Sequence, residues 1–412
     1  MLDRFGLWTT LAVAGTVLTA ALAVVPAAAA ASVSASAAAP VSAAAAPVSA
    51  SAAASVSPAA IGGAQLSGRG VIVNYPPGSV RRLPGVRASA FVIADAGTGQ
   101  VLAARDPHGW YRPASTLKVL TAIALIPVLN PDATVVATKQ ATTVVPNVVG
   151  LIPGHAYQIA GLFTALLTIS ANDAAVALTQ ATGSFGRGMA LINAEARHLR
   201  ADDTVAVQPN GLDGPGQRTS AYDLALIARQ ALKMPAFLKY DQAITAKFQV
   251  SAKKQVTLYN QNGLLTSYPG AVGGKIGWTS AAGATYLGIA RRNGVTLIVT
   301  LLHCPALTEV DSAKSLLNWG FAVDGKVRPV GTLVSALSPS APAPAQSVRA
   351  QSVPPRSVAA VQSAAGRSHS VASGLSVLAA AGFSCVALLA AGIGFAYSRR
   401  RRPAARYPRQ RD

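Results

Sequence analysis

A serine and a lysine lie one helical turn apart at the start of a long apolar run, in the segment 111–122. Ser115 is followed three residues later by Lys118, so on a helix the two side chains share one face. A serine hydroxyl becomes a nucleophile when a nearby base takes its proton, and a lysine amine can act as that base if burial or positive charge keeps it neutral. Ser251 and Lys254 repeat the spacing in a polar stretch, so the spacing alone does not identify a catalytic pair.

Two further groups of polar residues follow along the chain. Ser170 and Asn172 come at the end of an apolar helix pattern, where small polar side chains can reach into a cleft; the alternative is that they cap a helix. Lys275 lies in the glycine-rich, strand-like segment 273–283, where glycines permit close backbone approach and the lysine offers a positive charge to a substrate anion. The alternative for Lys275 is an exposed lysine near a strand turn. Taken singly, each group is better explained by its alternative.

Together the three groups match, in chain order, the Ser-x-x-Lys, Ser-x-Asn and Lys-Thr-Gly motifs of penicillin-binding proteins and serine β-lactamases. Several other segments resemble the D-alanyl-D-alanine carboxypeptidase family of low-molecular-mass penicillin-binding proteins. These segments are Pro113-Ala114-Ser115-Thr116, Ser170-Ala171-Asn172-Asp173-Ala174-Ala175, Asn210-Gly211-Leu212-Asp213, Ser220 to Ala225, Asn260 to Leu265 and Leu316 to Phe321. The resemblance covers residues 88–321.

The resemblance implies a serine-type D-Ala-D-Ala carboxypeptidase that acts on peptidoglycan stem peptides and is acylated by β-lactams. It implies Ser115 as the nucleophile, Lys118 as its base and Ser170 as a proton relay toward the leaving amine. The implied substrate-binding residues are Asn172 for a substrate amide, Lys275 and Thr279 for the terminal carboxylate, and Gly277 and Trp278. The backbone N–H groups of Ser115 and Trp278 would form the oxyanion hole. No cofactor is implied.

Two departures from the family pattern bear on recognition of the carboxylate. Ile276 stands where the family usually has threonine, and the segment 302–309 lacks the arginine that members often carry after the last strand. These departures leave open a catalytically weak, membrane-tethered homologue that holds cell-wall peptide. The three shared motifs also leave open a class A-like β-lactamase. The β-lactamase needs a glutamate that activates the deacylating water. Glu195 is the only glutamate between the second and third motifs, and its context differs.

Strand-like segments at both ends of the central region must position these motifs. Two pairs of such segments surround turn sequences and predict hairpins, one across 90–104 and one across 285–302, the second with Asn293-Gly294 at its turn. Helix-like stretches lie between or after them, at 119–129, 161–180, 188–199, 222–233 and 310–319. This order predicts an α+β fold with an antiparallel sheet. The family resemblance implies a β-lactamase/transpeptidase-like fold, with helices flanking the sheet and a helical subdomain.

Composition divides the chain into six predicted segments: a signal peptide (1–30), an Ala/Ser/Pro-rich spacer (31–65), the serine DD-peptidase domain (66–325), a disordered Ser/Pro/Ala linker (326–373), a transmembrane helix (374–397) and an Arg-rich cytoplasmic tail (398–412). The N-terminal apolar run followed by alanines is typical of a secretory signal, with an uncleaved anchor as the alternative. No charged residue occurs between 371 and 398, and four arginines follow at once. These features predict a single-pass protein of the cell membrane with an extracellular catalytic domain.

The formal net charge of +20 is unevenly distributed, because the tail from 399 to 412 contains seven arginines and one aspartate. The remaining positive charge suits an exported domain that meets an acidic cell-surface polymer. The chain has no nucleic-acid-binding motif, so we expect no nucleic-acid partner. Cys304 and Cys385 are not expected to pair, since Cys385 falls in the predicted membrane helix, and Cys304 is expected to pack in the core. The five histidines lack zinc-ligand spacing, so no metal is expected.

Overall fold

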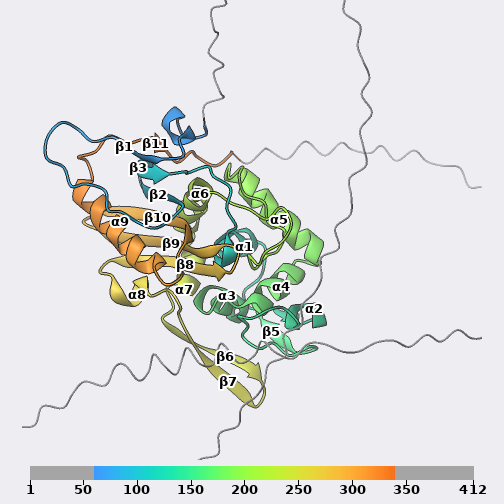
Figure 1. The fold of residues 1–412 in the computed structure, drawn as a ribbon. Coiled ribbons are helices and arrows are strands. Elements are labelled where there is room, and N and C mark those ends of the chain that lie inside the picture. Colours follow the sequence, from blue (N-terminus) through green and yellow to red (C-terminus); the bar gives the residue numbers. More distant parts are fainter. Residues whose placement is uncertain (1–59, 339–412) are drawn as a thin grey trace, which may run out of the picture. The chain divides into compact units, whose positions relative to one another are not determined.

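The structure is a computed structural model that describes residues 60–338 (Figure 1). The predicted signal peptide, transmembrane helix and Arg-rich tail, with most of the spacer and linker, lie outside these residues. Within residues 60–338, none of the helices combines the length and the apolar character that crossing a membrane requires.

An antiparallel sheet of seven strands forms the centre of the fold, as predicted. Its order is β1-β3-β2-β10-β9-β8, and β11 pairs with β3 beside β1. The strands are β1 (Val71–Val73), β2 (Ala90–Asp95), β3 (Gln100–Arg105), β8 (Ala271–Thr279), β9 (Gly283–Arg292), β10 (Val295–Cys304) and β11 (Gly331–Thr332). Both predicted hairpins are confirmed, as β2–β3 and β9–β10. Asn293 and Gly294 have φ of 50° and 83° at the second turn, the positive values that such a two-residue turn requires.

Helices cover both faces of the sheet (Figure 1). One face packs against α8 (Leu264–Ser267) and α9 (Glu309–Val323), around the buried Trp319. The opposite face packs against the 3-10 helix η2 (Ala114–Leu117), α1 (Lys118–Leu125) and α6 (Ala221–Ala231). Alternate residues of a strand point to opposite faces, so β2 sends Phe91 and Ile93 to the α9 side and Val92 and Ala94 to the α1 side. Every residue of α1 is buried, which agrees with the mostly apolar sequence of this helix.

A helical subdomain is inserted between the two hairpins of the sheet. It contains α2 (Lys139–Thr142), α3 (Ile159–Thr168), α4 (Asn172–Ala181), α5 (Phe185–His198), α7 (Pro235–Asp241), and the small two-stranded sheets β4 (Thr134–Val136) with β5 (Ala156–Gln158) and β6 (Thr245–Ser251) with β7 (Lys254–Tyr259). Ser251 and Lys254 pair across the β6–β7 turn, so their catalytic spacing is coincidental. The helix predicted over 161–180 is wrong in one respect. Ser170 has a φ of 62°, a left-handed conformation that cannot continue a helix, so the stretch forms two helices.

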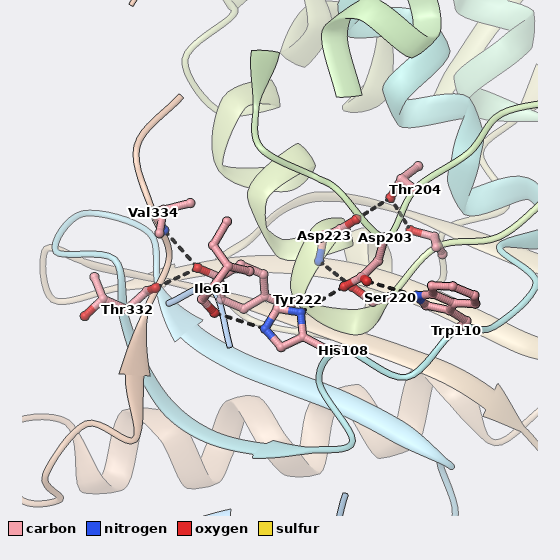
Figure 2. A network of polar contacts seen from close by, with 11 residues as sticks. Ile61, His108, Trp110, Asp203, Thr204, Ser220, Tyr222, Asp223, Thr332 and Val334 are labelled. Carbon is pink, nitrogen blue, oxygen red and sulfur yellow. Dashed lines mark hydrogen bonds and ion pairs between the residues drawn. The ribbon is translucent and has the colours of Figure 1, made fainter. Parts of the chain in front are cut away.

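Residues on both sides of the predicted domain limits at 66 and 325 also make contacts near the start of α6 (Figure 2). The His108 Nε2 lies 3.0 Å from the Ile61 carbonyl oxygen, and the backbone N–H of Thr332 donates to the Gly62 carbonyl at 2.8 Å. The Tyr222 hydroxyl donates to the Thr332 carbonyl at 2.7 Å. These contacts use backbone groups, which every residue type carries. Composition therefore could not distinguish the packed ends from a spacer.

Acidic groups complete this contact between the two ends of the domain (Figure 2). Asp203 accepts from His108 Nδ1 at 2.8 Å and from Trp110 Nε1 at 2.9 Å. Asp223 is fully buried and accepts from the Thr204 hydroxyl at 2.7 Å, while its other carboxylate oxygen has no hydrogen-bond partner among residues 60–338. Burial raises the pKa of Asp223 to about 7, although the hydrogen bond from Thr204 opposes this. The folded protein therefore holds a proton on Asp223 that the unfolded chain releases near pH 4.

We expect Asp223→Asn to flatten the pH dependence of folding stability. Between pH 4 and 7 the folded state binds more protons at this site than the unfolded state, so stability falls as pH rises, by on the order of 1 kcal/mol per pH unit. Asparagine removes this titration. Urea unfolding of both proteins at pH 5, 6 and 8 measures the difference in slope. The exposed Asp311→Asn is the matched control, and parallel slopes for wild type and Asp223→Asn would contradict the expectation.

Candidate active site

The structure places Ser115 and Lys118 in contact at the junction of η2 and α1. The Lys118 Nζ lies 2.8 Å from the Ser115 Oγ. Ser115 is half-buried within η2, and Lys118 is the first residue of α1 and is completely buried. The predicted pair is therefore confirmed as a contact, and the serine hydroxyl is directly available to a lysine amine.

The Lys118 amine is surrounded by oxygen acceptors and forms no ion pair with an acidic residue of the described segment 60–338. Besides Ser115, its Nζ donates to the Asn172 Oδ1 at 2.7 Å and to the Asn210 carbonyl oxygen at 2.6 Å. Burial lowers the pKa of Lys118 well below its usual range, the positive charge of Lys275 lowers it further, and Asp173 opposes the shift. A neutral amine has two N–H donors and one lone pair. In this neutral form, donation to Asn172 and Asn210 uses both N–H groups, and the 2.8 Å contact with the Ser115 Oγ is then one in which the lone pair can accept the hydroxyl proton.

The segment from Ser170 to Asn172 meets α1 at the start of α4. Neither side chain caps α4, because the residue preceding the helix is Ala171 and no side-chain cap hydrogen bond forms. The capping alternative is therefore wrong. Asn172 bridges Lys118 and the Val145 carbonyl, to which its Nδ2 donates at 2.7 Å. The Ser170 Oγ is buried and has no hydrogen-bond partner among residues 60–338, so no hydrogen bond joins it to the pair.

Asp173 fixes the loop that packs over this segment. Its carboxylate accepts from the backbone N–H groups of Val149 at 3.0 Å, Gly150 at 2.9 Å and Leu151 at 3.0 Å. The same loop supplies the carbonyl of Asn147, which accepts from the Asn172 N–H at 2.7 Å. Asp173 is thus a positioning residue for Asn172. The sequence offered only its place next to the Ser-x-Asn motif as a signal.

A second loop closes over the serine from the other side. The Asn210 carbonyl contacts Lys118, and Gly211 follows with a φ of 82°. A Cβ at Gly211 would overlap the Ala114 carbonyl oxygen, so only glycine allows this loop to lie against η2. Arg112 and Asp213 form an ion pair at 3.2 Å and line a cavity of about 420 Å³ beside this loop. Sequence reasoning noticed the Asn-Gly-Leu-Asp segment but could not assign the backbone carbonyl that acts.

Strand β8, which carries Lys275 and Gly277, packs against η2 at Ser115. A Cβ on Gly277 would lie 2.6 Å from the Ser115 backbone nitrogen, which shows how closely β8 approaches η2. Lys275 is buried rather than exposed, so its alternative interpretation is wrong. Its Nζ donates to the Ile276 carbonyl at 2.9 Å, and burial lowers the pKa of Lys275 to about 7 while Asp241 opposes the shift.

Asp241 is a buried partner of this strand that sequence reasoning missed. Its Oδ2 accepts from the Gly274 N–H at 2.8 Å, and its Oδ1 has no hydrogen-bond partner among residues 60–338. Burial raises the pKa of Asp241 to about 7, against the hydrogen bond from Gly274 and the charge of Lys275. Asp241 ends α7, thirty-four positions before Lys275 in the chain, and no local pattern marks it.

The remaining predicted residues lie at the far end of β8. Trp278 is exposed, and the Thr279 Oγ1 accepts from the Ala282 N–H at 3.0 Å within the turn to β9. Ile276 pairs with Tyr286 and packs on the α9 side of the sheet, opposite to Lys275. An aliphatic side chain at 276 thus extends the core.

Glu195 does not reach the catalytic pair through any hydrogen bond. It lies on α5, where its carboxylate contacts His198 Nδ1 at 3.2 Å. Within residues 60–338, no carboxylate is hydrogen-bonded to Ser115 or Lys118, and no group of His, Cys, Asp and Glu residues is arranged to hold a metal ion. Cys304 packs in the core as expected, and burial raises the pKa of its thiol to about 12.

This fold and this lysine-paired serine define a serine peptidase of the penicillin-binding-protein type. The model of the D-alanyl-D-alanine carboxypeptidase family matches residues 79–305, and the chain belongs to that family. It is thus a serine-type D-Ala-D-Ala carboxypeptidase with the predicted transpeptidase-like α+β fold.

Known relatives agree with this assignment. The chain is 39% identical over 264 residues to the D-alanyl-D-alanine carboxypeptidase DacB2 of Mycobacterium tuberculosis, covering 63% of this chain and 90% of that protein. It is 30% identical over 254 residues to the D-alanyl-D-alanine carboxypeptidase DacD of Salmonella typhimurium, and the match covers 58% of this chain and 63% of that protein. A solved penicillin-binding protein homologue from M. tuberculosis, Rv2911, superposes with a TM-score of 0.59 at 38% identity, covering 64% of this chain and 100% of that one. A mutant of the Streptomyces K15 DD-transpeptidase superposes with a TM-score of 0.55 at 27% sequence identity. The match covers 58% of this chain and 99% of that one.

We expect Asp173→Asn to destabilise the domain by about 2 kcal/mol, because an amide cannot accept all the loop N–H groups that the carboxylate holds. Urea unfolding measures this, and the exposed Asp132→Asn serves as the control. The same variant should also slow penicillin acylation, since Asn172 loses its support. A stability within 0.5 kcal/mol of wild type would refute the positioning role of Asp173.

Proposed function

We propose that the enzyme trims the terminal D-alanine from peptidoglycan stem peptides through an acyl-enzyme on Ser115. The observation that carries the proposal is the buried Lys118 amine, 2.8 Å from the Ser115 Oγ and without an acidic hydrogen-bond partner among residues 60–338. Its lowered pKa supports a neutral base at physiological pH.

In the acylation step, the Ser115 Oγ bonds to the carbonyl carbon between the two D-alanines while Lys118 accepts the hydroxyl proton. The carbonyl oxygen gains negative charge and accepts hydrogen bonds from the backbone N–H groups of Ser115 and Trp278. The close approach of Gly277 to Ser115 supports this pairing of donors. Loss of one such donor in other enzymes costs about 3 kcal/mol of transition-state stabilisation.

Collapse of this intermediate breaks the peptide C–N bond. The leaving amine of D-alanine takes the proton that Lys118 accepted, with the Ser170 hydroxyl as the relay; its lack of a partner among residues 60–338 leaves it able to serve this role. Water then attacks the ester, Lys118 accepts a water proton, and the Ser115 oxygen recovers a proton as it leaves.

Substrate recognition is assigned to residues on either side of Ser115, from α4 and from β8. Asn172 holds a substrate amide, supported by its fixed contacts with Lys118 and the Val145 carbonyl. Lys275 and Thr279 attract the terminal carboxylate, and Lys275 does so in its protonated form. Ile276 turns toward the core and contributes no hydroxyl, which weakens this recognition compared with a threonine.

β-Lactams are proposed to acylate Ser115 by the same attack. Ring opening leaves the departing amine tethered to the acyl group, so it continues to occupy the site. Glu195 pairs with His198 on α5, and no carboxylate is bonded to the catalytic pair within residues 60–338. A class A-like route for rapid deacylation therefore lacks its general base, and the penicilloyl adduct is expected to persist.

Replacing the nucleophile tests the proposed function. Ser115→Ala should reduce D-alanine release from diacetyl-Lys-D-Ala-D-Ala by roughly a thousandfold or more and abolish labelling by penicillin. Ser251→Ala removes the serine of the coincidental pair and should leave both unchanged. Mass spectrometry of the penicillin-treated protein should locate the adduct on Ser115.

Three outcomes would count against the proposal. Labelling of a residue other than Ser115 would reject the nucleophile. Penicillin labelling of the wild-type protein without D-alanine release would favour the catalytically weak, peptide-holding homologue, for which Ile276 is the motivating feature. Rapid multiple turnover of nitrocefin would favour the β-lactamase.

We also propose that the protein is exported and held in the cell membrane by a single C-terminal helix, with its catalytic domain extracellular. The uncharged segment 374–397 followed by four arginines supports this topology, and the segment 1–30 supports export. Deleting residues 374–412 should release an active enzyme from the membrane fraction, whereas deleting 403–412 should not. Recovery of the full-length protein in the soluble fraction would reject the anchor.

A further inference from the structure

A cavity of about 570 Å³ lies at the end of the sheet remote from the catalytic serine. Trp278 pairs with Ala284 at the catalytic end, and Arg292, which lines the cavity, lies eight residues further along β9. At the rise of a β-strand this separation is roughly 25 Å. The cavity is therefore distinct from the peptidase site. Its volume is within the range of small-molecule sites.

Arg292 is held rigidly at the cavity wall. Its guanidinium lies over the Tyr268 ring at 4.3 Å and the Phe321 ring at 5.0 Å. Its Nε donates to the Pro269 carbonyl at 3.2 Å, and its Nη1 donates to the Asn318 Oδ1 at 3.3 Å. These contacts fix the plane of the guanidinium before any ligand arrives, which reduces the entropy lost on binding.

The positive charge of Arg292 is not neutralised within the described part of the chain. No carboxylate of residues 60–338 forms an ion pair with Arg292 or with Arg81, which faces the same cavity. Two of the five N–H donors of Arg292 are used, so three stay available. Residues 60–338 contain 24 lysines and arginines against 13 acidic residues, so the surrounding field also favours an anion.

The other walls of the cavity suit a hydroxylated body attached to that anion. Phe321 offers an apolar face, the exposed amides of Asn293 and Asn318 offer further donors, and Asp324 offers an acceptor for hydroxyl groups. Asp324 would repel a ligand that consisted of negative charge alone. The combination of two arginines, amides, one carboxylate and an aromatic face fits a phosphate carried on a sugar.

We propose that this cavity is a second binding site, which takes a sugar phosphate through Arg81 and Arg292. The site does not depend on the peptidase chemistry. The phosphate accepts from the two guanidinium groups, and the sugar lies against Phe321 with its hydroxyls toward Asn318 and Asp324.

Titration calorimetry of the full-length protein with N-acetylglucosamine 1-phosphate tests the proposal, with inorganic phosphate and N-acetylglucosamine as partial ligands. We expect the sugar phosphate to bind more tightly than phosphate, and the neutral sugar not to bind. Arg81→Gln removes one charge from an exposed side chain. Arg292→Lys keeps the charge but loses the planar fork. Each should weaken binding about tenfold.

Arg82→Gln is the matched control, because Arg82 is the exposed neighbour of Arg81, lies over Tyr75 and does not line the cavity. It should change affinity less than twofold. An equal effect of Arg82→Gln and Arg81→Gln would overturn the proposal in favour of diffuse surface charge. Absence of binding, or equal binding of the neutral sugar, would also overturn it. So would Arg81-dependent binding to phosphatidylglycerol vesicles without binding of the sugar phosphate, which would assign the cavity to lipid headgroups. Penicillin labelling of Ser115 should persist in every variant, which separates this test from that of the peptidase.

Discussion

Burial of the Lys118 amine is the constraint on which the rest of the active site depends. A buried ammonium without an acidic partner is costly, so the environment favours the neutral amine. The same burial requires partners for the remaining N–H groups, and the Asn172 side chain and the Asn210 carbonyl provide them. The lone pair is thereby directed to Ser115. One desolvated nitrogen thus sets both the protonation state and the geometry of the nucleophile.

Three separate parts of the fold must meet for this arrangement to exist. The helical subdomain supplies Asn172, a loop supplies the Asn210 carbonyl, and the sheet supplies β8. Two glycines allow the backbones of these parts to lie in close contact. Gly277 brings β8 against the Ser115 nitrogen, and Gly211 brings the loop against η2. The catalytic arrangement is therefore a property of the junction between the sheet and the helical subdomain.

The two aspartates of the site, Asp173 and Asp241, bond to backbone N–H groups and not to the lysine amines. Asp173 uses its carboxylate on loop N–H groups, and Asp241 uses one oxygen on the Gly274 N–H. A carboxylate bonded directly to Lys118 would hold it in the charged form and remove its function as a base. Asp241 instead supports the charge of Lys275 from a distance. Burial thus lowers the pKa of both lysines, and in each case a nearby aspartate, Asp173 for Lys118 and Asp241 for Lys275, opposes the shift.

The sequence alone determined the spacing of Ser115 and Lys118, both hairpins and the α+β class, because these depend on local periodicity and turn chemistry. The order of the three motifs was meaningful through the resemblance to a known family. The sequence could not show that the Asn210 carbonyl binds Lys118, since any residue offers a carbonyl. Nor could it show that Asp241 accepts from the Gly274 N–H next to Lys275, or that segments outside 66–325 contact the fold. Those features are contacts between positions far apart in the chain. Only the packing of the sheet against the helical subdomain brings such positions together, so the tertiary structure decided them.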